Sequence, residues 1–309
     1  MEQNKAFDRL ATAAENFIKQ ERWSRRWSNL LKIIIVLYVL ISLGTLVKQI
    51  SPADELSTSS KHVGIVSLQG AIMPGSKTSA DAINPLLRDA FSDPKTQAVI
   101  IKANSPGGSP VQSAMINDEI TRLKEKYKKP VYVVVQDLCA SGCYYVAVAA
   151  DKIFANKGSI VGSIGVRMDT FGFTGLMSKL GIENRSMHAG EHKTFIDPFS
   201  PEDKTGRAFF QKNILDKSHD QFIETVKKGR GDRLKINKDT FTGLVWLGDA
   251  AVKNGLIDGL GDTGYVERDI IKNTNEKNYE GRKSLIEQMM GDISTETASK
   301  LSLYLSQLY

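Results

Sequence analysis

The sequence predicts an α/β protein with a mainly parallel sheet, preceded by one N-terminal transmembrane helix. Short runs rich in β-branched residues alternate with segments of helical spacing. These runs are almost continuously apolar, as in strands covered on both faces of a sheet. One long apolar stretch stands near the N-terminus. The 309 residues suffice for one large domain or two ordinary ones.

The composition excludes several classes of protein. Hydrophobic residues make up 41% and charged residues 25% of the chain, which excludes disordered and collagen-like proteins. The 2 cysteines are too few for a disulfide scaffold, and they lack the second Cys or His pair of the usual zinc sites, so we expect no metal. The net charge of +6 is modest, and no basic stripe interleaved with aromatic residues is present. We therefore expect no nucleic-acid partner.

The apolar stretch runs from Leu30 to Val47 and is interrupted only by Lys32. As a helix it would be roughly 27 Å long, close to the thickness of the hydrocarbon core of a bilayer. A buried core helix is the alternative, but no polar stripe interrupts the run. Lys32 lies near enough to the end to snorkel, and Trp23 and Trp27 stand where an interfacial aromatic belt would. We expect a membrane anchor at 30–47.

The charges around the anchor predict its orientation. The positive-inside rule places a cytoplasmic segment at residues 1–29 and everything beyond the anchor outside, in a single-pass inner-membrane protein. A cleavable signal peptide fits less well, because about thirty residues precede the apolar run and no small-x-small site follows it. The basic residues before the anchor are Lys5, Arg9, Lys19, Arg22, Arg25 and Arg26, against Lys48 and Lys61 in the first stretch after it.

The chain after the anchor reads as a tether followed by β-α-β units. Residues 48–62 are polar and rich in turn formers, which is typical of a tether. Near-continuous apolar strands with helical crossovers between them favour a parallel sheet. The expected strands begin at Val63, Ala98 and Val131, and the expected helices cover 78–91 and 116–127.

The second half of the folded domain predicts one long helix and a short mixed segment. Ser200 as N-cap, with Pro201 and Asp203 in the first turn, predicts a helix that ends at Gly229. From Thr242 the pattern indicates a strand, a short helix and glycine turns. We expect the main domain to cover 63–270 and a C-terminal helical extension to cover 271–309.

Three Gly/Ser-rich segments stand at or near strand ends, where open α/β sheets place their sites. They cover Asn104–Ser109, Cys139–Tyr145 and Gly158–Val166. In the first segment, a sharp turn at Gly107-Gly108 can point backbone N–H groups toward an oxyanion, although a plain βα turn is the alternative. A phosphate loop is excluded, because no Lys-Ser/Thr pair follows.

Ser141 directly follows the third strand, and an apolar helix begins at once. It is either an ordinary N-cap or a nucleophile whose oxyanion would meet the N–H groups of Gly108 and Gly142. Cys139 and Cys143 occupy the glycine places of a G-x-S-x-G elbow, so that motif is not matched. We expect both cysteines to pack as small apolar side chains, with a catalytic thiol or a mutual disulfide as alternatives.

A nucleophilic serine needs a base, and two candidates are adjacent in the sequence. His192 could complete a triad with Asp197 or Asp137. Lys193 is the other candidate, because a lysine becomes a base where burial lowers its pKa from about 10.4 toward neutrality. A solvated lysine in a loop is the alternative. If the segment is extended, the two side chains face opposite sides, so only one reaches the serine.

Four motifs together resemble the signal peptide peptidase A family, the membrane-anchored Ser/Lys peptidases that share the fold of crotonase and of the proteolytic subunit of Clp protease. The resemblance covers about Val63 to Asp262 and implies a ClpP/crotonase-like fold of repeated β-α-β units. The motifs are S-P-G-G at Ser105–Gly108, A-S-G-G-Y-Y at Ala140–Tyr145 with Cys143 in place of its second glycine, G-S-I-G-V at Gly162–Val166 and A-G-E-x-K-x-x-x-D-P-F at Ala189–Phe199.

The resemblance also implies roles for individual residues. Ser141 would be the nucleophile, Lys193 the general base, and Ser163 the hydroxyl that orients the lysine. Gly108 and Gly142 would supply the oxyanion-hole N–H groups, and no cofactor is implied. The sequence departs from the family pattern in ways that bear on substrate preference, at Cys143, His192 and Phe195.

The function that the resemblance implies is a membrane-anchored serine endopeptidase that cleaves residual signal peptides after export through an acyl-enzyme. Its partners would be peptide substrates, the membrane and further copies of itself, in a ring-like homo-oligomer whose Ser and Lys can come from neighbouring subunits. One alternative is a catalytically inactive membrane scaffold with a peptidase fold. Another is a crotonase-type acyl-CoA enzyme, but a domain outside the cytoplasm would have no coenzyme A to use.

Overall fold

The structure is a computed structural model, in which the chain divides into two units, residues 1–59 and 60–309. In the first unit the described residues are helical and exposed. The structure describes residues 32–38, 40, 42 and 60–281.

Most of the predicted N-terminal organisation lies outside the described residues. This holds for residues 1–29, for half of the anchor at 30–47, and for most of the tether at 48–62. Among the residues that are described, none belongs to a helix long and apolar enough to span a bilayer.

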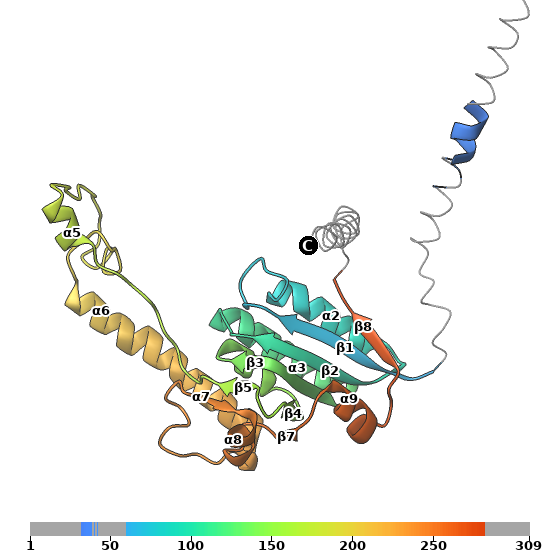
Figure 1. The fold of residues 1–309 in the computed structure, drawn as a ribbon. Coiled ribbons are helices and arrows are strands. Elements are labelled where there is room, and N and C mark those ends of the chain that lie inside the picture. Colours follow the sequence, from blue (N-terminus) through green and yellow to red (C-terminus); the bar gives the residue numbers. More distant parts are fainter. Residues whose placement is uncertain (1–31, 39, 41, 43–59, 282–309) are drawn as a thin grey trace, which may run out of the picture. The chain divides into compact units, whose positions relative to one another are not determined.

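The second unit is built on one sheet, in which every strand pair is parallel except β5 with β6. The strand order is β6-β5-β3-β2-β1-β8, and β4 lies between β3 and β7 (Figure 1). The α/β fold with a mainly parallel sheet is therefore confirmed. The strands are β1 His62–Gln69, β2 Thr96–Ser105, β3 Val131–Ala140, β4 Lys152–Ala155, β5 Ile160–Gly162, β6 Val245–Leu247, β7 Gly259–Leu260 and β8 Glu276–Tyr279.

Two helices cross over between the first three strands, and both begin at the residues that a capping argument favours. Ser79 caps α2 by accepting from the Ala82 N–H, and Ser109 caps α3 by accepting from the Gln112 N–H. The helices are α2 Ala80–Ser92, α3 Pro110–Tyr127, α4 Gly142–Ala147, α5 Thr174–Lys179, α6 Lys204–Phe210, α7 Asp216–Arg230, α8 Gly248–Lys253 and α9 Thr263–Tyr265, with wider turns η2 Gln211–Leu215 and η4 Val266–Ile271 and a tight turn η3 Gly231–Arg233.

The central strands bury side chains on both faces, which explains their continuous apolar character. Val99 and Ile101 of β2 belong to the larger core cluster, together with residues of α2, α3 and α4. Ile100, between them, belongs to a second cluster that includes Val266 of η4. Because successive side chains of a strand point to opposite faces, neither face of β2 can be polar.

The helix expected from Ser200 to Gly229 differs in its start. α6 begins at Lys204, where the Asp203 side chain caps it by accepting from the Gly206 N–H, while the Ser200 hydroxyl donates instead to Asp197 at 2.6 Å. η2 and α7 continue the helical path to Arg230. The chain also returns to the sheet beyond 270, because β8 pairs with β1, so residues 276–279 are a strand rather than part of a helical extension. Residues 282–309 lie outside the described part.

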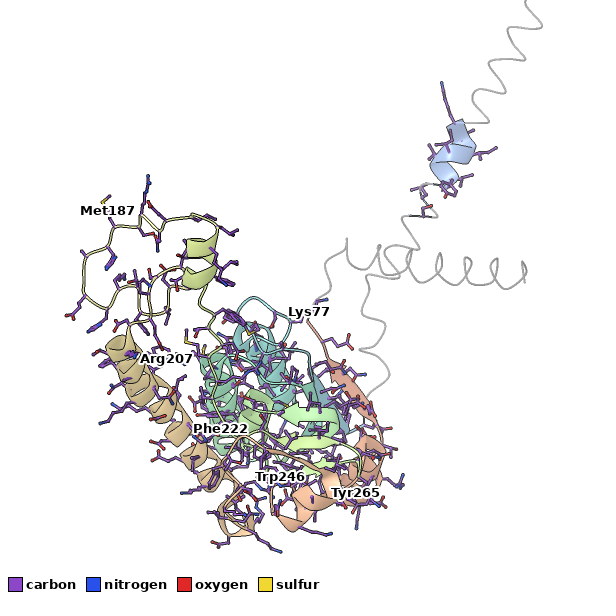
Figure 2. All side chains as sticks on the ribbon, turned by 60° about the vertical axis from the view of Figure 1, so that its left-hand side comes forward. Lys77, Met187, Arg207, Phe222, Trp246 and Tyr265 are labelled. Atoms are coloured by element: carbon purple, nitrogen blue, oxygen red, sulfur yellow. A yellow bond between two sulfur atoms is a disulfide. The ribbon has the colours of Figure 1, made fainter. Side chains whose placement is uncertain are left out.

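Residues 167–210, which we call the arm, are mostly exposed. They include α5 and α6, and Gly206 is the only residue of the arm that is buried. Two aromatic pairs pack within the arm: Phe173 with Phe199, and Phe195 with Phe210. The Met187 side chain is 98% exposed and points into open space (Figure 2).

Candidate active site

The three Gly/Ser-rich turns come together at the carboxyl ends of β2, β3 and β5. These strands are neighbours in the sheet and run parallel, so their carboxyl ends meet at one edge. A cavity of about 980 Å³ opens there. Its lining includes Gly107, Gly108, Ser141, Gly142 and Ser163. The structure thus gathers four of the five predicted site residues around one cavity.

Ser141 has an unusual backbone conformation, with φ of 53° and ψ of −123°. Its N–H donates to the Gly162 carbonyl at 2.8 Å, and its carbonyl accepts from the Tyr145 N–H at 3.0 Å. The side chain makes no capping hydrogen bond to α4, so the ordinary N-cap reading of this serine is not what the structure shows. Ser141 lines the cavity.

Two serines that line the cavity have backbone conformations that are uncommon for residues with a side chain. In the part of the chain that the structure describes, four such residues have positive φ. Lys128 and Lys272 are left-handed helix C-caps, a common place for this conformation. The other two are Ser141 and Ser163, which both line the cavity. Strained backbone that is not explained by a cap concentrates at functional sites.

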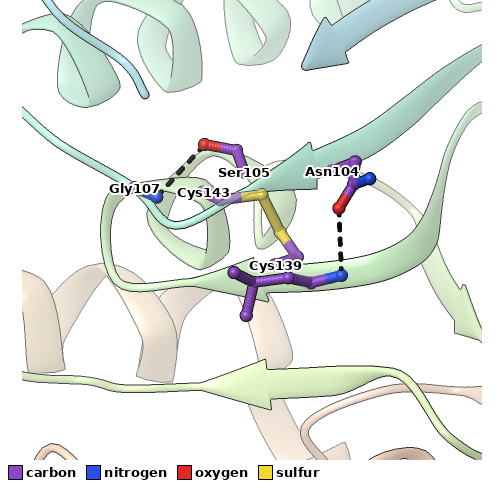
Figure 3. The surroundings of a disulfide bond; sticks show 6 residues. Asn104, Ser105, Gly107, Cys139 and Cys143 are labelled. Carbon is purple, nitrogen blue, oxygen red and sulfur yellow. Dashed lines mark hydrogen bonds between the residues drawn. A yellow bond between two sulfur atoms is a disulfide. The ribbon is translucent and has the colours of Figure 1, made fainter. Parts of the chain in front are cut away.

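The two glycine turns leave no room for side chains between them. A Cβ atom on Gly108 would lie 2.2 Å from the Ile72 carbonyl oxygen. One on Gly142 would lie 2.4 Å from Ser113 Oγ and 3.1 Å from the Gly108 nitrogen, so the backbones of the two turns are in contact. The Ser105 hydroxyl holds the first turn by accepting from the Gly107 N–H at 3.1 Å (Figure 3). Adjacent backbone N–H groups in such a place can bind an oxyanion.

Ser163 is held by the residue just before the edge strand β6. Its N–H donates to the Leu244 carbonyl at 2.8 Å. Gly162, just before it, has φ of 113°, and a Cβ there would lie 2.8 Å from the Trp246 ring. The Trp246 ring therefore packs directly against the turn that carries Ser163.

Lys193 is the predicted site residue that the chain does not bring to the cavity. It is exposed on a turn of the arm, where its N–H donates to the Gly190 carbonyl at 3.1 Å. It does not line the cavity around Ser141. In the single chain the cavity is therefore lined by Ser141, Gly108 and Gly142 but not by Lys193.

The histidine triads considered from the sequence are not formed. His192 Nδ1 lies 2.6 Å from Asp203 Oδ2, and this hydrogen bond raises the pKa of the imidazole. The two carboxylates proposed as its partners are engaged elsewhere. Asp197 accepts from the Ser200 hydroxyl, and Asp137 accepts from the Asn104 amide. His192 thus ties the turn that carries Lys193 to the start of α6.

One feature of the site was left open by the sequence, and another was not predicted. Cys139 and Cys143 form a disulfide, which was one of the alternatives to our expectation that they pack as small apolar side chains. Both are fully buried, so the packing itself is confirmed. The cavity wall also includes apolar side chains of α3, α4 and α7. For α3, the sequence carried a signal in the pair of apolar residues at i and i+4 in its first turns. These wall residues are Val111, Met115, Tyr145 and Phe222.

Comparison with known proteins identifies relatives of the chain. The family described as "Peptidase family S49" matches residues 123–277. The chain is 43% identical over 206 residues to a protein named Na(+)/H(+) antiporter NhaA from Brucella melitensis, a match that covers 65% of this chain and 28% of that protein. It is 37% identical over 201 residues to the putative protease MJ0651 of Methanocaldococcus jannaschii, covering 65% and 62%.

A third relative is the putative signal peptide peptidase SppA of Enterococcus faecium, 32% identical over 175 residues, covering 57% of this chain and 50% of that protein. In these three matches the chain spans between 28% and 62% of the relative's length. A solved structure of a mutant 1510-N membrane-bound stomatin-specific protease in complex with a substrate peptide has a TM-score of 0.44 at 16% identity. This match covers 77% of this chain and 99% of the other.

Proposed function

The chain belongs to peptidase family S49, and we propose on that premise that it is a serine endopeptidase that cleaves residual signal peptides after protein export. The observation that carries the proposal is the cavity at the carboxyl edge of the sheet. There Ser141, whose backbone is strained and whose side chain does not cap α4, stands beside the closely packed turns of Gly108 and Gly142. A serine hydroxyl next to paired backbone N–H groups is the arrangement that acyl transfer requires.

The proposed chemistry uses a Ser/Lys dyad. Neutral Lys193 takes the proton of the Ser141 hydroxyl while Oγ attacks the peptide carbonyl. The N–H groups of Gly108 and Gly142 donate to the resulting oxyanion, and one such donor contributes roughly 10²–10³-fold to the rate. The intermediate collapses, the lysine gives its proton to the leaving amine, and water then releases the acyl group by the same route. Ser163 would hydrogen-bond the lysine and orient it.

The position of Lys193 leads us to infer that a neighbouring copy of the chain completes the site. In the single chain the lysine is exposed on the arm and absent from the cavity wall. The arm also carries large exposed apolar side chains such as Phe171 and Leu180, which a second copy would cover. Contact with that copy would exclude water from the amine, and desolvation favours its neutral form. Oligomerisation is then a requirement for activity.

Two observations support the substrate and the location. The apolar wall around Val111 and Met115 suits the apolar core of a signal peptide. The Cys139–Cys143 disulfide is typical of an oxidising compartment, which fits a domain outside the cytoplasm. The apolar segment at 30–47 would hold this domain at the membrane that contains the substrate.

Covalent labelling tests the nucleophile. Full-length protein in detergent is treated with a fluorophosphonate probe and with an apolar peptide substrate. We expect labelling of the wild type at Ser141, and neither labelling nor cleavage by Ser141→Ala or Lys193→Ala. An oligomeric wild type that is not labelled would favour the inactive scaffold instead.

Mixing two inactive variants tests whether the dyad is shared between subunits. Ser141→Ala and Lys193→Ala proteins are dissociated, combined and reassembled. If the lysine comes from a neighbour, some mixed sites contain both native residues and cleavage returns. If each chain uses its own lysine, the mixture stays inactive while the wild type, taken through the same treatment, recovers.

A further inference from the structure

A disulfide brackets the proposed nucleophile. Cys139 lies near the end of β3 and Cys143 lies in the first turn of α4, with their Cα atoms 5.1 Å apart. Ser141 stands midway between them in the chain. Both cysteines have an exposure of 0%, and neither lines the cavity. The bond joins β3 to α4 (Figure 3).

Both ends of this bridge are firmly held. Cys139 is paired with Val161 of β5 and with Ser105 of β2, so it belongs to the middle of the sheet. On the other side, Tyr144 donates its hydroxyl to the Leu256 carbonyl at 2.7 Å, and the Asn117 amide donates to the Tyr145 carbonyl at 2.7 Å. These contacts anchor α4. The bridge therefore joins two rigid elements and leaves three residues between them.

These three residues include both proposed reactive groups of the turn, the Ser141 hydroxyl and the Gly142 N–H. The φ of 53° at Ser141 is unfavourable for a residue with a side chain, and such a conformation costs on the order of 1–3 kcal/mol. It persists only where the surroundings over-determine it. The loop closed by Cys139 and Cys143 is the shortest constraint across this position.

We propose that the Cys139–Cys143 disulfide is a positioning element, which holds the Ser141 hydroxyl and the Gly142 N–H in their reactive arrangement. The proposal rests on the proposed function, because it assigns the bridge a role in acylation. Neither sulfur touches the substrate. The bridge acts through the backbone of the residues that it encloses, and loss of the bridge should slow acylation by Ser141 more than it weakens substrate binding.

A mutant cycle tests this role. The variants Cys139→Ala, Cys143→Ala and the double variant are compared by their rate of fluorophosphonate inactivation and by kcat and KM for peptide cleavage. Misplacement of a reacting group by about 1 Å costs roughly 10²-fold, so we expect a 10- to 100-fold loss in kcat and in the inactivation rate with little change in KM. Either single variant breaks the same bond, so both singles and the double variant should show the same loss. Losses that add, or unchanged rates, would overturn the proposal.

Val148→Ala provides a matched control, because Val148 is a buried residue at the end of α4 outside the bracket. It should lower the melting temperature without slowing acylation. A second measurement needs no mutation and covers the case in which the variants fail to fold. Reduction of the native wild type with a phosphine should lower its rate of fluorophosphonate inactivation to that of the double variant, and reoxidation should restore this rate. Val148→Ala should respond to both treatments as the wild type does.

Three outcomes separate this proposal from the proposed function. Unfolded, non-reduced protein should take up no iodoacetamide, and uptake at both cysteines would show that no bridge exists. If wild-type protein with an intact bridge is not labelled at Ser141, the proposed function fails. If the wild type is labelled and fully reduced protein is labelled equally fast, only the positioning role fails.

Discussion

At the scale of single residues, the proposed oxyanion site depends on the absence of side chains. The space beside Gly142 is taken by the hydroxyl of Ser113, a fully buried residue of α3 that donates to the Ser109 carbonyl at 3.0 Å. A methyl group at position 142 must push either this hydroxyl or the Gly108 turn aside. The Gly108 turn carries one of the two proposed N–H donors. Moving this turn would therefore displace that donor from the oxyanion.

We expect Gly142→Ala to slow fluorophosphonate labelling by about 10²-fold, the loss typical of one oxyanion donor. The companion change Ser113→Ala removes the atom that a Cβ would meet at 2.4 Å, so the double variant should recover part of the rate. Gly158→Ala is the control, because a Cβ there would meet only Asn156 Oδ1 at 3.8 Å. A double variant as slow as Gly142→Ala would show that this clash is not the cause.

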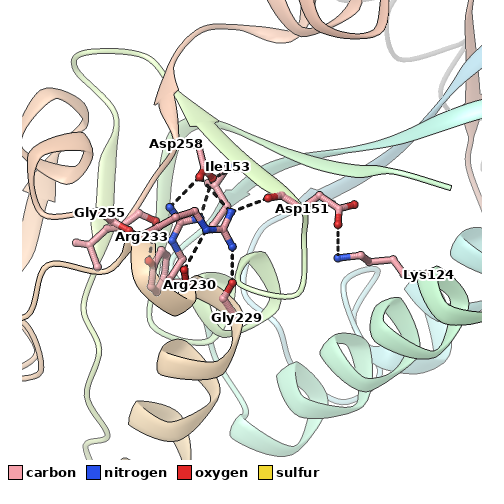
Figure 4. A network of polar contacts seen from close by, with 10 residues as sticks. Lys124, Asp151, Ile153, Gly229, Arg230, Arg233, Gly255 and Asp258 are labelled. Carbon is pink, nitrogen blue, oxygen red and sulfur yellow. Dashed lines mark hydrogen bonds and ion pairs between the residues drawn. The ribbon is translucent and has the colours of Figure 1, made fainter. Parts of the chain in front are cut away.

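At the scale of elements, a buried ion pair holds α7 against the sheet. The Arg230 guanidinium donates to both carboxylate oxygens of Asp258, at 2.7 and 3.1 Å, and to the Gly255 carbonyl at 2.9 Å (Figure 4). Asp258 also accepts from the Ile153 N–H of β4, and Arg233 donates to it from the exposed side. α7 carries Phe222 into the cavity wall, so this network connects the stability of an element with the shape of the site.

A second element, β8, carries a carboxyl group that interacts with a carboxyl group of η4. Burial and a hydrogen bond between Glu267 and Glu276 raise the pKa of Glu267 to about 7, from 4.5. Glu267 is 5% exposed and belongs to η4, whereas Glu276 begins β8. Below pH 4.5 the carboxyl group is protonated in both the folded and the unfolded chain. Between pH 4.5 and 7 the unfolded state binds fewer protons, so the free energy of unfolding falls as the pH rises.

Urea unfolding at about pH 5 and about pH 8 tests this dependence. We expect Glu267→Gln, which stays neutral, to be more stable than the wild type at the higher pH, by on the order of 2 kcal/mol. At the lower pH the two proteins should differ little. Glu280→Gln is the control, because Glu280 follows β8 and is exposed. An equal difference at the two pH values would mean that the titration of Glu267 does not contribute.

At the scale of the whole molecule, the arm is a part of the described chain that exposes many large apolar side chains to solvent. A packed domain rarely exposes many large apolar side chains in one segment. Here they occur together with Lys193, whose proposed partner Ser141 lies in a cavity that the lysine does not line. One neighbouring copy would account for both features. It would cover the apolar side chains, and each copy would place its Lys193 beside the Ser141 of the other.

We therefore expect Phe171→Glu, at a side chain that is 74% exposed, to shift the protein toward monomer in sedimentation and to abolish peptide cleavage. The cavity residues are untouched, so the melting temperature of the monomer should change little. Ile236→Glu is the matched control, since Ile236 is 58% exposed but lies outside the arm. A Phe171→Glu protein that is monomeric and still cleaves peptide would contradict the shared dyad.

The local patterns of the sequence predicted most of the fold and part of the site. Continuous β-branched runs predicted β1 to β3, and turn formers and apolar periodicity predicted α2 and α3, because these signals act over a few residues. The start of α3 lies at Pro110, earlier than the expected 116, because its buried, periodic apolar residues begin only after its first turns. The motifs also indicated Ser141, Gly108, Gly142 and Ser163, which the sheet then brings to one cavity. Parallel strands bring their carboxyl ends to one edge, so this convergence follows from topology.

Other features depended on contacts between distant segments and could not be derived from the sequence. The start of the long helix moved from Ser200 to Lys204, because the Asp203 carboxylate, and not the Ser200 hydroxyl, accepts the first N–H. β8 lies beside β1 although the two strands stand at opposite ends of the folded unit's sequence, and the positive φ of Ser141 is visible only in three dimensions.

The class of fold could be predicted from residue patterns of short range, and the family and the proposed reactive residues from the resemblance of four short motifs to a known family. Only the tertiary structure decided that Ser141 is strained and bracketed by a disulfide, and that Lys193 lies on an exposed arm away from it. The physical reason is range: propensities and caps act over a single turn, whereas burial and the meeting of two side chains depend on how remote segments pack.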